Sequence, residues 1–247
     1  MPQYFGSFIE GDPFIHYSVS HLIMLLITVL VIILMYAYKR ASESFQWGRL
    51  VLALLLILSE GSLHYWYFAN GIFSPVDTLP LELCSISALL CIIMLLTKSY
   101  RIYEIVFFWG LGGATQALLT PVLDFPYPYF RFFQFFITHI AIVLACLYMT
   151  WIKGYRPTMR SVWKSFGWLQ ILALCVFAVN KWVGANYMFL SHKPHYPTLL
   201  DLLGPYPGYI IWLELIALGV FFLLYAPFGI QNWLGKKKRI TSRLISK

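Results

Sequence analysis

Long apolar stretches separated by short polar segments form the main pattern along the chain. Most are close to twenty residues long, which is the length a helix needs to cross the hydrocarbon core of a bilayer. The connections are short and rich in turn residues, and no repeat or soluble domain interrupts them. The pattern predicts one all-α transmembrane domain over residues 1–247. Its seven transmembrane helices are expected at 17–38, 49–69, 79–97, 102–120, 132–152, 166–184 and 207–227.

Composition supports a membrane protein. Of the 247 residues, 60% are hydrophobic, 19% aromatic and 11% charged, and the mean hydropathy is +0.72. A soluble domain is usually about 25% charged. These values exclude a disordered protein, a soluble enzyme and a coiled coil.

The basic residues predict the orientation. The net charge is +8 and the pI about 9.3, but the placement of the charges indicates membrane topology rather than nucleic-acid binding. Fifteen of the 18 Lys and Arg residues fall in alternate connections and in the tail, and the exceptions are Arg131, Lys181 and Lys193. Because cytoplasmic loops are enriched in Lys and Arg, we expect the N-terminus outside and residues 235–247 to form a basic cytoplasmic tail. That arrangement requires an odd number of spans.

Polar side chains recur inside the predicted helices, mostly within about 6–11 Å of their outer ends at ~1.5 Å per residue. Such groups cost free energy in hydrocarbon. We therefore expect them to face a common cavity that opens to the outer leaflet or to the extracellular side. The residues are His21, Glu60, His64, Glu82, Cys84, Gln134, His139 and Glu214.

A thiol and an imidazole at one depth predict nucleophilic chemistry. Cys84 and His139 form the candidate pair, since a buried thiol needs a neighbouring base to become a nucleophile. A carboxylate would orient the imidazole as the third member of a triad does, and a side-chain amide would donate to an oxyanion. The candidates for these supporting roles are Glu60 or Glu214 for the carboxylate and Asn186 or Gln134 for the amide.

The same residues allow structural interpretations. Glu60 and His64 are i, i+4 neighbours on one helix face, where they would form a polar bridge. Small residues at Gly110, Gly113 and Ala114 would let two helices approach closely. Four polar residues could instead bind a metal: His21, Glu60, His64 and His139. The remaining cysteines, Cys91, Cys146 and Cys175, would be apolar packing residues.

Two functions other than an enzyme also fit. A transporter or small-molecule binder would use Glu60, His64 and Glu214 as proton or substrate sites, although no inverted repeat or helix broken in mid-span supports it. The other alternative is a non-catalytic membrane scaffold.

Three segments carry a resemblance to a known family. They are LPLELCSISALL (79–90), the stretch 120–139 containing PVLDFPYPYFRFFQFFITH, and NYMFLSHKPHYPTLLDLLGPYPGYI (186–210). Together they resemble the YwaF-like family of bacterial seven-helix membrane proteins. That family is related more distantly to eukaryotic intramembrane acyltransferases that remodel ether phospholipids. It is also related to androgen-induced-gene type hydrolases, which cleave fatty acid esters of hydroxy fatty acids.

The resemblance implies a lipid acyltransferase or lipid-ester hydrolase in a bacterial plasma membrane. Cys84 and His139 correspond by position to the proposed catalytic pair of the acyltransferases, whereas the hydrolases use a Thr nucleophile. We expect membrane lipids as acyl donor and acceptor, and no metal or other cofactor. Substrate contacts are expected from Asn186, Tyr187 and Lys193, with Lys193 meeting a phosphate headgroup.

Overall fold

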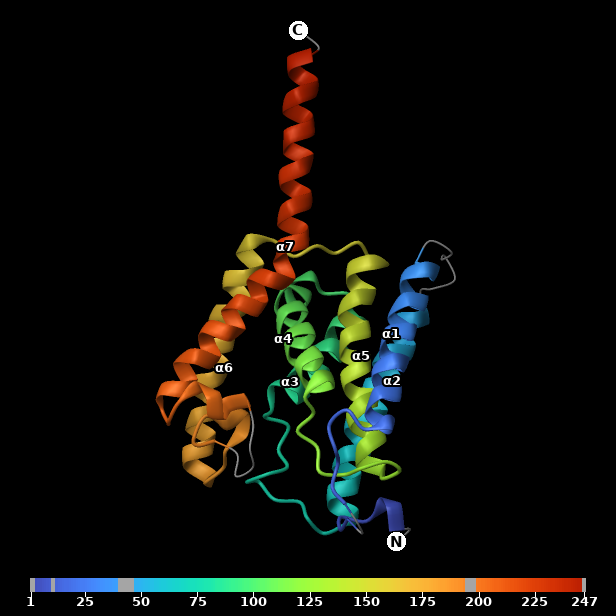
Figure 1. Ribbon diagram of the computed structural model, residues 1–247, viewed down its shortest axis with the longest axis vertical. Coiled ribbons are helices and arrows are strands. Elements are labelled where there is room, and N and C mark those ends of the chain that lie inside the picture. Colours follow the sequence, from blue (N-terminus) through green and yellow to red (C-terminus); the bar gives the residue numbers. More distant parts are fainter. Residues whose placement is uncertain (1–2, 10–11, 40–46, 194–198, 246–247) are drawn as a thin grey trace.

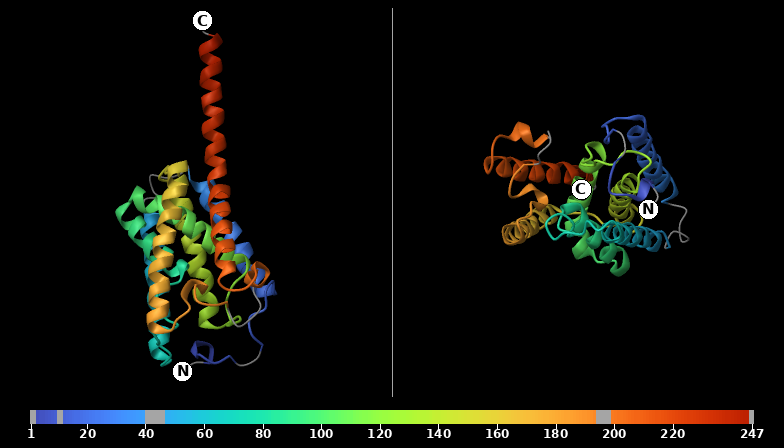
Figure 2. Two further views of the ribbon diagram at one scale, coloured as in Figure 1. Left: turned by 90° about the vertical axis from the view of Figure 1, so that its left-hand side faces the viewer. Right: turned by 90° about the horizontal axis from the view of Figure 1, so that it is seen from below.

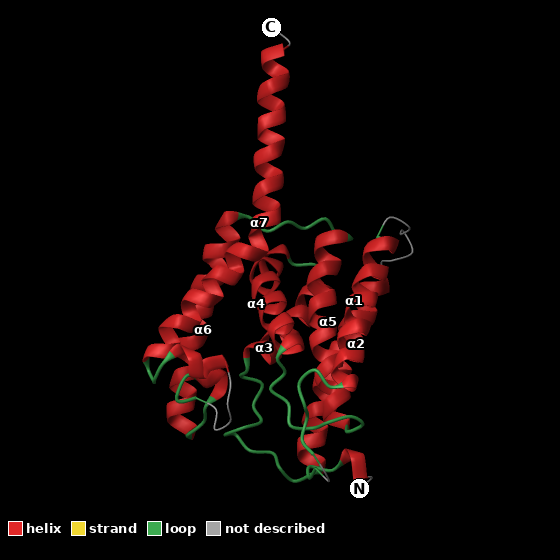
Figure 3. Ribbon diagram, viewed as in Figure 1, coloured by secondary structure: helices red, strands yellow, loops and turns green. Residues whose placement is uncertain are grey.

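The computed structural model describes residues 3–9, 12–39, 47–193 and 199–245, and in these ranges it contains helices and loops but no strand (Figure 3). The architecture is that of a polytopic helical membrane protein. The long helices are α1 (Val19–Tyr38), α2 (Gly48–Ala69), α3 (Leu83–Thr97), α4 (Tyr100–Leu119), α5 (Phe130–Trp151), α6 (Met159–Val183) and α7 (Gly208–Ile245). The predicted all-α class is confirmed.

Successive helices run in opposite directions, so the connections alternate between two ends of the bundle (Figure 1). The N-terminus lies at one end, which we call the N-terminal end, and the C-terminus lies beyond the other. Helix α5 is the central helix and contacts α1, α2, α3 and α4, while α6 and α7 pack on the opposite side of α4 (Figure 2).

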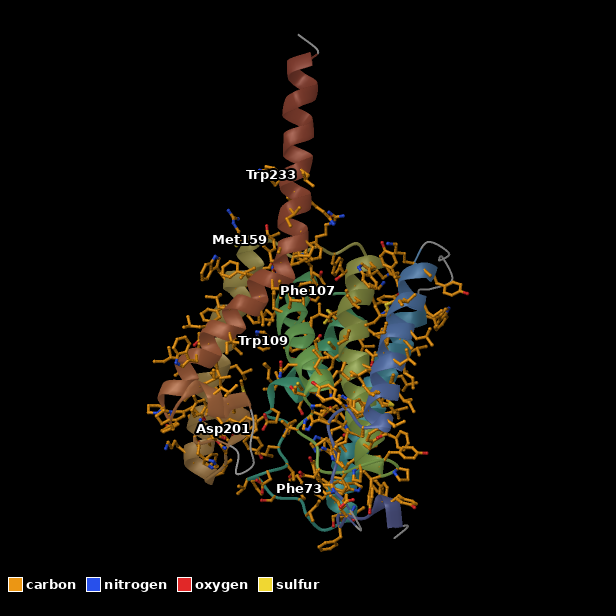
Figure 4. All side chains as sticks on the ribbon, viewed as in Figure 1. Phe73, Phe107, Trp109, Met159, Asp201 and Trp233 are labelled. Carbon is orange, nitrogen blue, oxygen red and sulfur yellow. The ribbon has the colours of Figure 1, made fainter. Side chains whose placement is uncertain are left out.

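Side chains of α4 join the two parts of the bundle (Figure 4). The Trp109 indole donates a hydrogen bond to the carbonyl of Ser165 in α6 at 3.2 Å. The Phe107 and Phe228 rings lie 5.7 Å apart and connect α4 with α7. Helix α4 therefore bridges the central helix and the α6–α7 pair.

Local sequence accounts for several helix ends. Thr158 and Ser161 form a capping box, so α6 begins at Met159, several residues before the predicted 166. Ser99 caps α4 through the N–H of Ile102. The predicted helix starts missed these residues because hydropathy detects the apolar core of a helix, whereas the polar cap determines where its first turn begins.

Helix α3 is shorter than its predicted span. It has 15 residues, about 22 Å at 1.5 Å per residue, which is shorter than the ~30 Å hydrocarbon core. Within the described residues, six helices are long and apolar enough to cross a membrane, and α3 is not among them. Pro80 disfavours helical backbone at Leu79, and the chain stays non-helical until Glu82. The backbone there is partly satisfied by the Leu79 N–H, which donates to the Tyr187 hydroxyl at 2.9 Å.

Helix α7 is longer than predicted. It continues through Pro227, where the chain was expected to leave the helix, and bends before projecting beyond the bundle (Figure 1). A proline removes one backbone hydrogen bond and kinks a helix without always ending it. The backbone of the predicted tail is thus helical as far as Ile245, while its side chains from 236 onward lie outside the described part of the chain.

The predicted small-residue stripe of α4 allows close contact with two neighbours. A Cβ added at Gly110 would lie 2.9 Å from Ile142 Cγ2 and 3.1 Å from Cys146 Sγ, both on α5. One added at Gly113 would lie 3.5 Å from Cys84 Sγ on α3. Close approach of α4 to α5 therefore depends on glycine at 110.

The substitution Gly110→Ala is expected to destabilise the fold by about 1–3 kcal/mol. Ile142 is fully buried, so the added methyl group can be accommodated only by moving packed atoms. Gly113→Ala is the matched control, because its methyl group makes an ordinary contact and alanine favours the helix. The measurement is thermal unfolding of both variants in the same detergent, and equal midpoints would contradict this account.

Reporter fusions are expected to place the two termini on opposite sides of the membrane. A reporter active only in the cytoplasm should be active after Lys247 and silent before Met1, because 15 of the 18 basic residues lie on one side of the predicted topology. Activity at both ends would mean that α3 does not carry the chain across.

Candidate functional site

Cys84 lies in the first turn of α3, inside the bundle. Glu82 is the N-cap residue but makes no capping hydrogen bond with its side chain. The first N–H groups of a helix have no partner within the helix, so such an end attracts negative charge. Cys84 is partly exposed, whereas Cys91 and Cys146 are buried and Cys175 is exposed. Two of the three predicted packing cysteines are thus core residues, and Cys175 lies on the outer surface of α6.

The packing of α4 brings Cys84 and His139 to about the same level. Gly110 faces Ile142 of α5, and Gly113, one turn further along α4, faces Cys84 of α3, as the neighbours of an added Cβ at each glycine indicate. Because α4 and α5 are antiparallel, one turn along α4 corresponds to one turn back along α5, from Ile142 to His139.

A backbone carbonyl, rather than the predicted carboxylate, orients His139. Its Nδ1 lies 2.7 Å from the carbonyl oxygen of Phe135, so Nδ1 carries the hydrogen and Nε2 is left as the basic nitrogen. The Phe135 ring lies against the imidazole with 4.1 Å between centroids. The orienting role predicted for Glu60 or Glu214 is therefore filled within α5 itself.

No hydrogen bond joins the Cys84 thiol to His139 among the described residues. The N-terminus of α3, where the first N–H groups have no partner within the helix, favours a thiolate at Cys84. Glu82 is turned toward the loop before α7, where its Oε2 accepts a hydrogen bond from the Met188 N–H at 3.1 Å.

A row of polar side chains joins α2 to α5 on the N-terminal side of His139. Ser59 Oγ lies 2.5 Å from Thr138 Oγ1, and Gln134 donates to the same Thr138 oxygen at 3.0 Å. Arg131 donates to Gln134 Oε1. Next to this row, Glu60 is buried, and its Oε2 has no hydrogen-bond partner in the described structure.

Two predicted supporting residues have other surroundings. The bridge between Glu60 and His64 is not formed in the described part of the chain, and the His64 ring instead packs near Tyr67 with 6.1 Å between centroids. Glu214 accepts a hydrogen bond from Gln170, so it joins α7 to α6. The rotation of each helix about its axis points these side chains toward different neighbours. The sequence indicates only their depth along each helix, which does not contain this information.

The residues predicted to contact substrate hold the loop before α7 together. The Asn186 side chain accepts from the N–H groups of Ser191 and His192 at 3.0 and 3.1 Å. Tyr187 is buried, and its hydroxyl donates to the Pro75 carbonyl at 2.8 Å. Lys193 forms an ion pair with Asp201 at 3.6 Å. These contacts tie the loop to the segment before α3 and to η4 (Leu199–Leu203).

The metal alternative is not supported by the geometry. His21 Nδ1 accepts from the Tyr17 N–H at 2.9 Å, and Nε2 lies 2.8 Å from the Leu118 carbonyl, so both ring nitrogens are used by the backbone. Within the described ranges, no group of three or more His, Cys, Asp or Glu side chains is arranged to hold a metal ion.

Comparison with known proteins identifies the family. A family model described as the TMEM164 family matches residues 16–225. The chain belongs to the TMEM164 family. No curated protein and no solved structure matches it.

The TMEM164-family match includes α1 to α6 and the first part of α7, and it ends just before Pro227. Both candidate catalytic residues and the polar row of α5 lie within it, whereas the projecting part of α7 does not.

Sequence reasoning missed several residues of the site. Arg131 was counted only as a charge, and Ser59 and Thr138 were not considered. The signal was available in the spacing of Arg131, Gln134 and Thr138, which lie on one helical face at i, i+3 and i+7. Ser87, three residues after Cys84 on α3, was given no role. Its hydroxyl is buried without a partner in the described structure.

Proposed function

We propose that this TMEM164-family protein is an intramembrane lipid acyltransferase or lipid-ester hydrolase, with Cys84 as nucleophile and His139 as general base. One observation carries the proposal: Cys84, a partly exposed residue at a helix N-terminus without a side-chain cap, lies level with an imidazole whose Nε2 is left as the base. The resemblance to YwaF-like proteins and, more distantly, to acyltransferases supports the same pair. The protein would act on the outer leaflet of a bacterial plasma membrane.

The reaction has two balanced steps. His139 Nε2 takes the Cys84 proton as sulfur attacks the acyl carbonyl, a C–S bond forms, the ester C–O bond breaks, and the alkoxide takes the proton back from His139. An acceptor hydroxyl or water then gives its proton to Nε2 and attacks the thioester, and the thiol is regenerated with that proton. Proton transfer to His139 accompanies the attack, so that no free thiolate has to form first. The first N–H groups of α3 are suitable donors to the oxyanion.

The absence of a hydrogen bond between the Cys84 thiol and His139 in the described structure is compatible with this mechanism. Catalytic hydrogen bonds are often long without substrate and shorten only in the reactive complex. The ester group would lie between the α3 N-terminus and α5.

The test is detection of the acyl-enzyme. Purified protein in liposomes is incubated with a phospholipid carrying an alkyne-tagged acyl chain, and tagged peptides are identified by mass spectrometry. We expect a hydroxylamine-sensitive adduct on Cys84. An ordinary thiol-alkylating probe is unsuitable, because exposed Cys175 would also react. Absence of an acyl adduct, together with proton-linked uptake of a solute, would favour the transporter. Glu60, whose buried Oε2 has no hydrogen-bond partner in the described structure, is a suitable proton site for it.

A further inference from the structure

We propose that Arg131 and the N-terminal turn of α5 bind the phosphate group of a glycerophospholipid. This inference rests on the proposed function for the identity of the lipid as substrate, but the binding site itself is argued from contacts and charge. Arg131 takes the role of phosphate contact that was predicted for Lys193, because the Lys193 ammonium group already pairs with Asp201.

Neutral side chains hold Arg131 in place, and in the described structure no carboxylate forms an ion pair with its guanidinium. Its guanidinium donates to Gln134 and lies 5.8 Å from the ring centroid of Trp66, a cation–π contact. Trp66 is itself fixed by donating to the Phe5 carbonyl at 2.7 Å. The ion pairs of the described structure join other residues, and Arg131 takes part in none of them.

The positive charge of Arg131 is unfavourable at its position on α5 as long as no anion is bound there. It lies in the first turn, where the helix dipole favours negative charge. No acidic residue occupies that turn, and the N-cap residue Tyr129 makes no side-chain cap. Glu60 and Asp124 act on Arg131 from a distance, but neither contacts it. An anion bound here would interact favourably with both the guanidinium and the helix end.

Arg131 and His139 lie along α5 in the order that a phospholipid requires. The two residues are eight positions apart on α5, roughly 12 Å along the axis, and Arg131 is nearer the N-terminal end. A glycerophospholipid carries its phosphate and acyl esters on one glycerol, with the phosphate at the bilayer surface and the esters just below it. One lipid would thus place its phosphate at Arg131 and an ester toward His139. Unlike Lys, Arg presents a planar fork that matches two phosphate oxygens.

The experiment measures lipid binding without turnover. All proteins carry Cys84→Ala and are titrated in detergent with a fluorescent-acyl phosphatidylglycerol or with the diacylglycerol bearing the same acyl chains. We expect Arg131→Gln to weaken phosphatidylglycerol binding by about tenfold or more and to leave diacylglycerol binding unchanged. Arg131→Lys should fall between, because it keeps the charge and loses the fork. Lys181→Gln is the matched control, since it removes an exposed positive charge from the same end of the bundle.

Three outcomes would overturn the proposal. Equal affinities of Arg131→Gln and its parent for phosphatidylglycerol would exclude a headgroup contact. Equal weakening by Lys181→Gln would indicate only a general surface charge. Displacement of the lipid by millimolar inorganic phosphate, with no preference for phosphatidylglycerol over diacylglycerol, would identify a site for free anions. If Arg131→Gln does not fold, the Arg131→Lys titration takes its place. Weaker binding of phosphatidylglycerol with unchanged diacylglycerol binding would support the proposal, and an unchanged affinity for both lipids would contradict it. Failure of acyl-enzyme formation with lipid binding intact would count against the catalytic mechanism alone.

Discussion

Replacing Cys84 with alanine is expected to abolish lipid acyl transfer and hydrolysis, with a loss of at least about 10³-fold in turnover. The nucleophile would be gone, whereas the fold should persist because Cys84 is only partly buried and borders Gly113, so little packed volume is lost. Cys84→Ser should keep only slight activity, since a hydroxyl is a poorer nucleophile that also depends on His139. The measurement is turnover of a fluorescent-acyl phospholipid, normalised to folded protein.

Two other cysteines provide matched controls for that loss. Cys91→Ala changes a buried thiol two turns further along α3, and Cys175→Ala changes an exposed thiol on α6. Both should retain turnover, because neither thiol lies at the α3 N-terminus. Unchanged turnover in Cys84→Ala would rule out the thiol mechanism, and loss of activity on chelation would then be the test for a metal-activated water.

Replacing His139 with glutamine is expected to lower turnover by about 10²–10⁴-fold, the usual contribution of a general base. Glutamine is similar in size and can still donate to the Phe135 carbonyl, so the packing around α5 should remain. It has no basic nitrogen to take the Cys84 proton. Lipid binding, measured separately, should be unaffected because Arg131 and the α5 N-terminus are unchanged.

His64→Ala is the histidine control. His64 makes no bridge to Glu60 within the described residues, and it packs near the Tyr67 ring. We therefore expect little effect on turnover per folded molecule. If His64→Ala is inactive and His139→Gln is active, the base has been assigned to the wrong helix.

The sequence located the two candidate catalytic residues but not their supporting groups. Depth along a helix follows from residue number, so Cys84 and His139 could be matched without a structure. The hydrogen-bond acceptor for His139 is a main-chain carbonyl, which carries no sequence signal. The resemblance implied substrate contacts from Asn186 and Tyr187, yet Asn186 accepts from the backbone of its own loop, and Tyr187 donates to the Pro75 carbonyl in the segment before α3.

By itself the sequence determined a multi-pass helical membrane protein, because hydropathy and helix length are properties of single segments in one dimension. Tertiary structure decided the length of α3, where an extended segment before Glu82 is stabilised by the distant Tyr187. It also decided which polar groups meet, because helix rotation and packing separate Glu214 from Glu60 and bring Ser59 of α2 against Thr138 of α5. Such contacts depend on several helices at once, and no single segment specifies them.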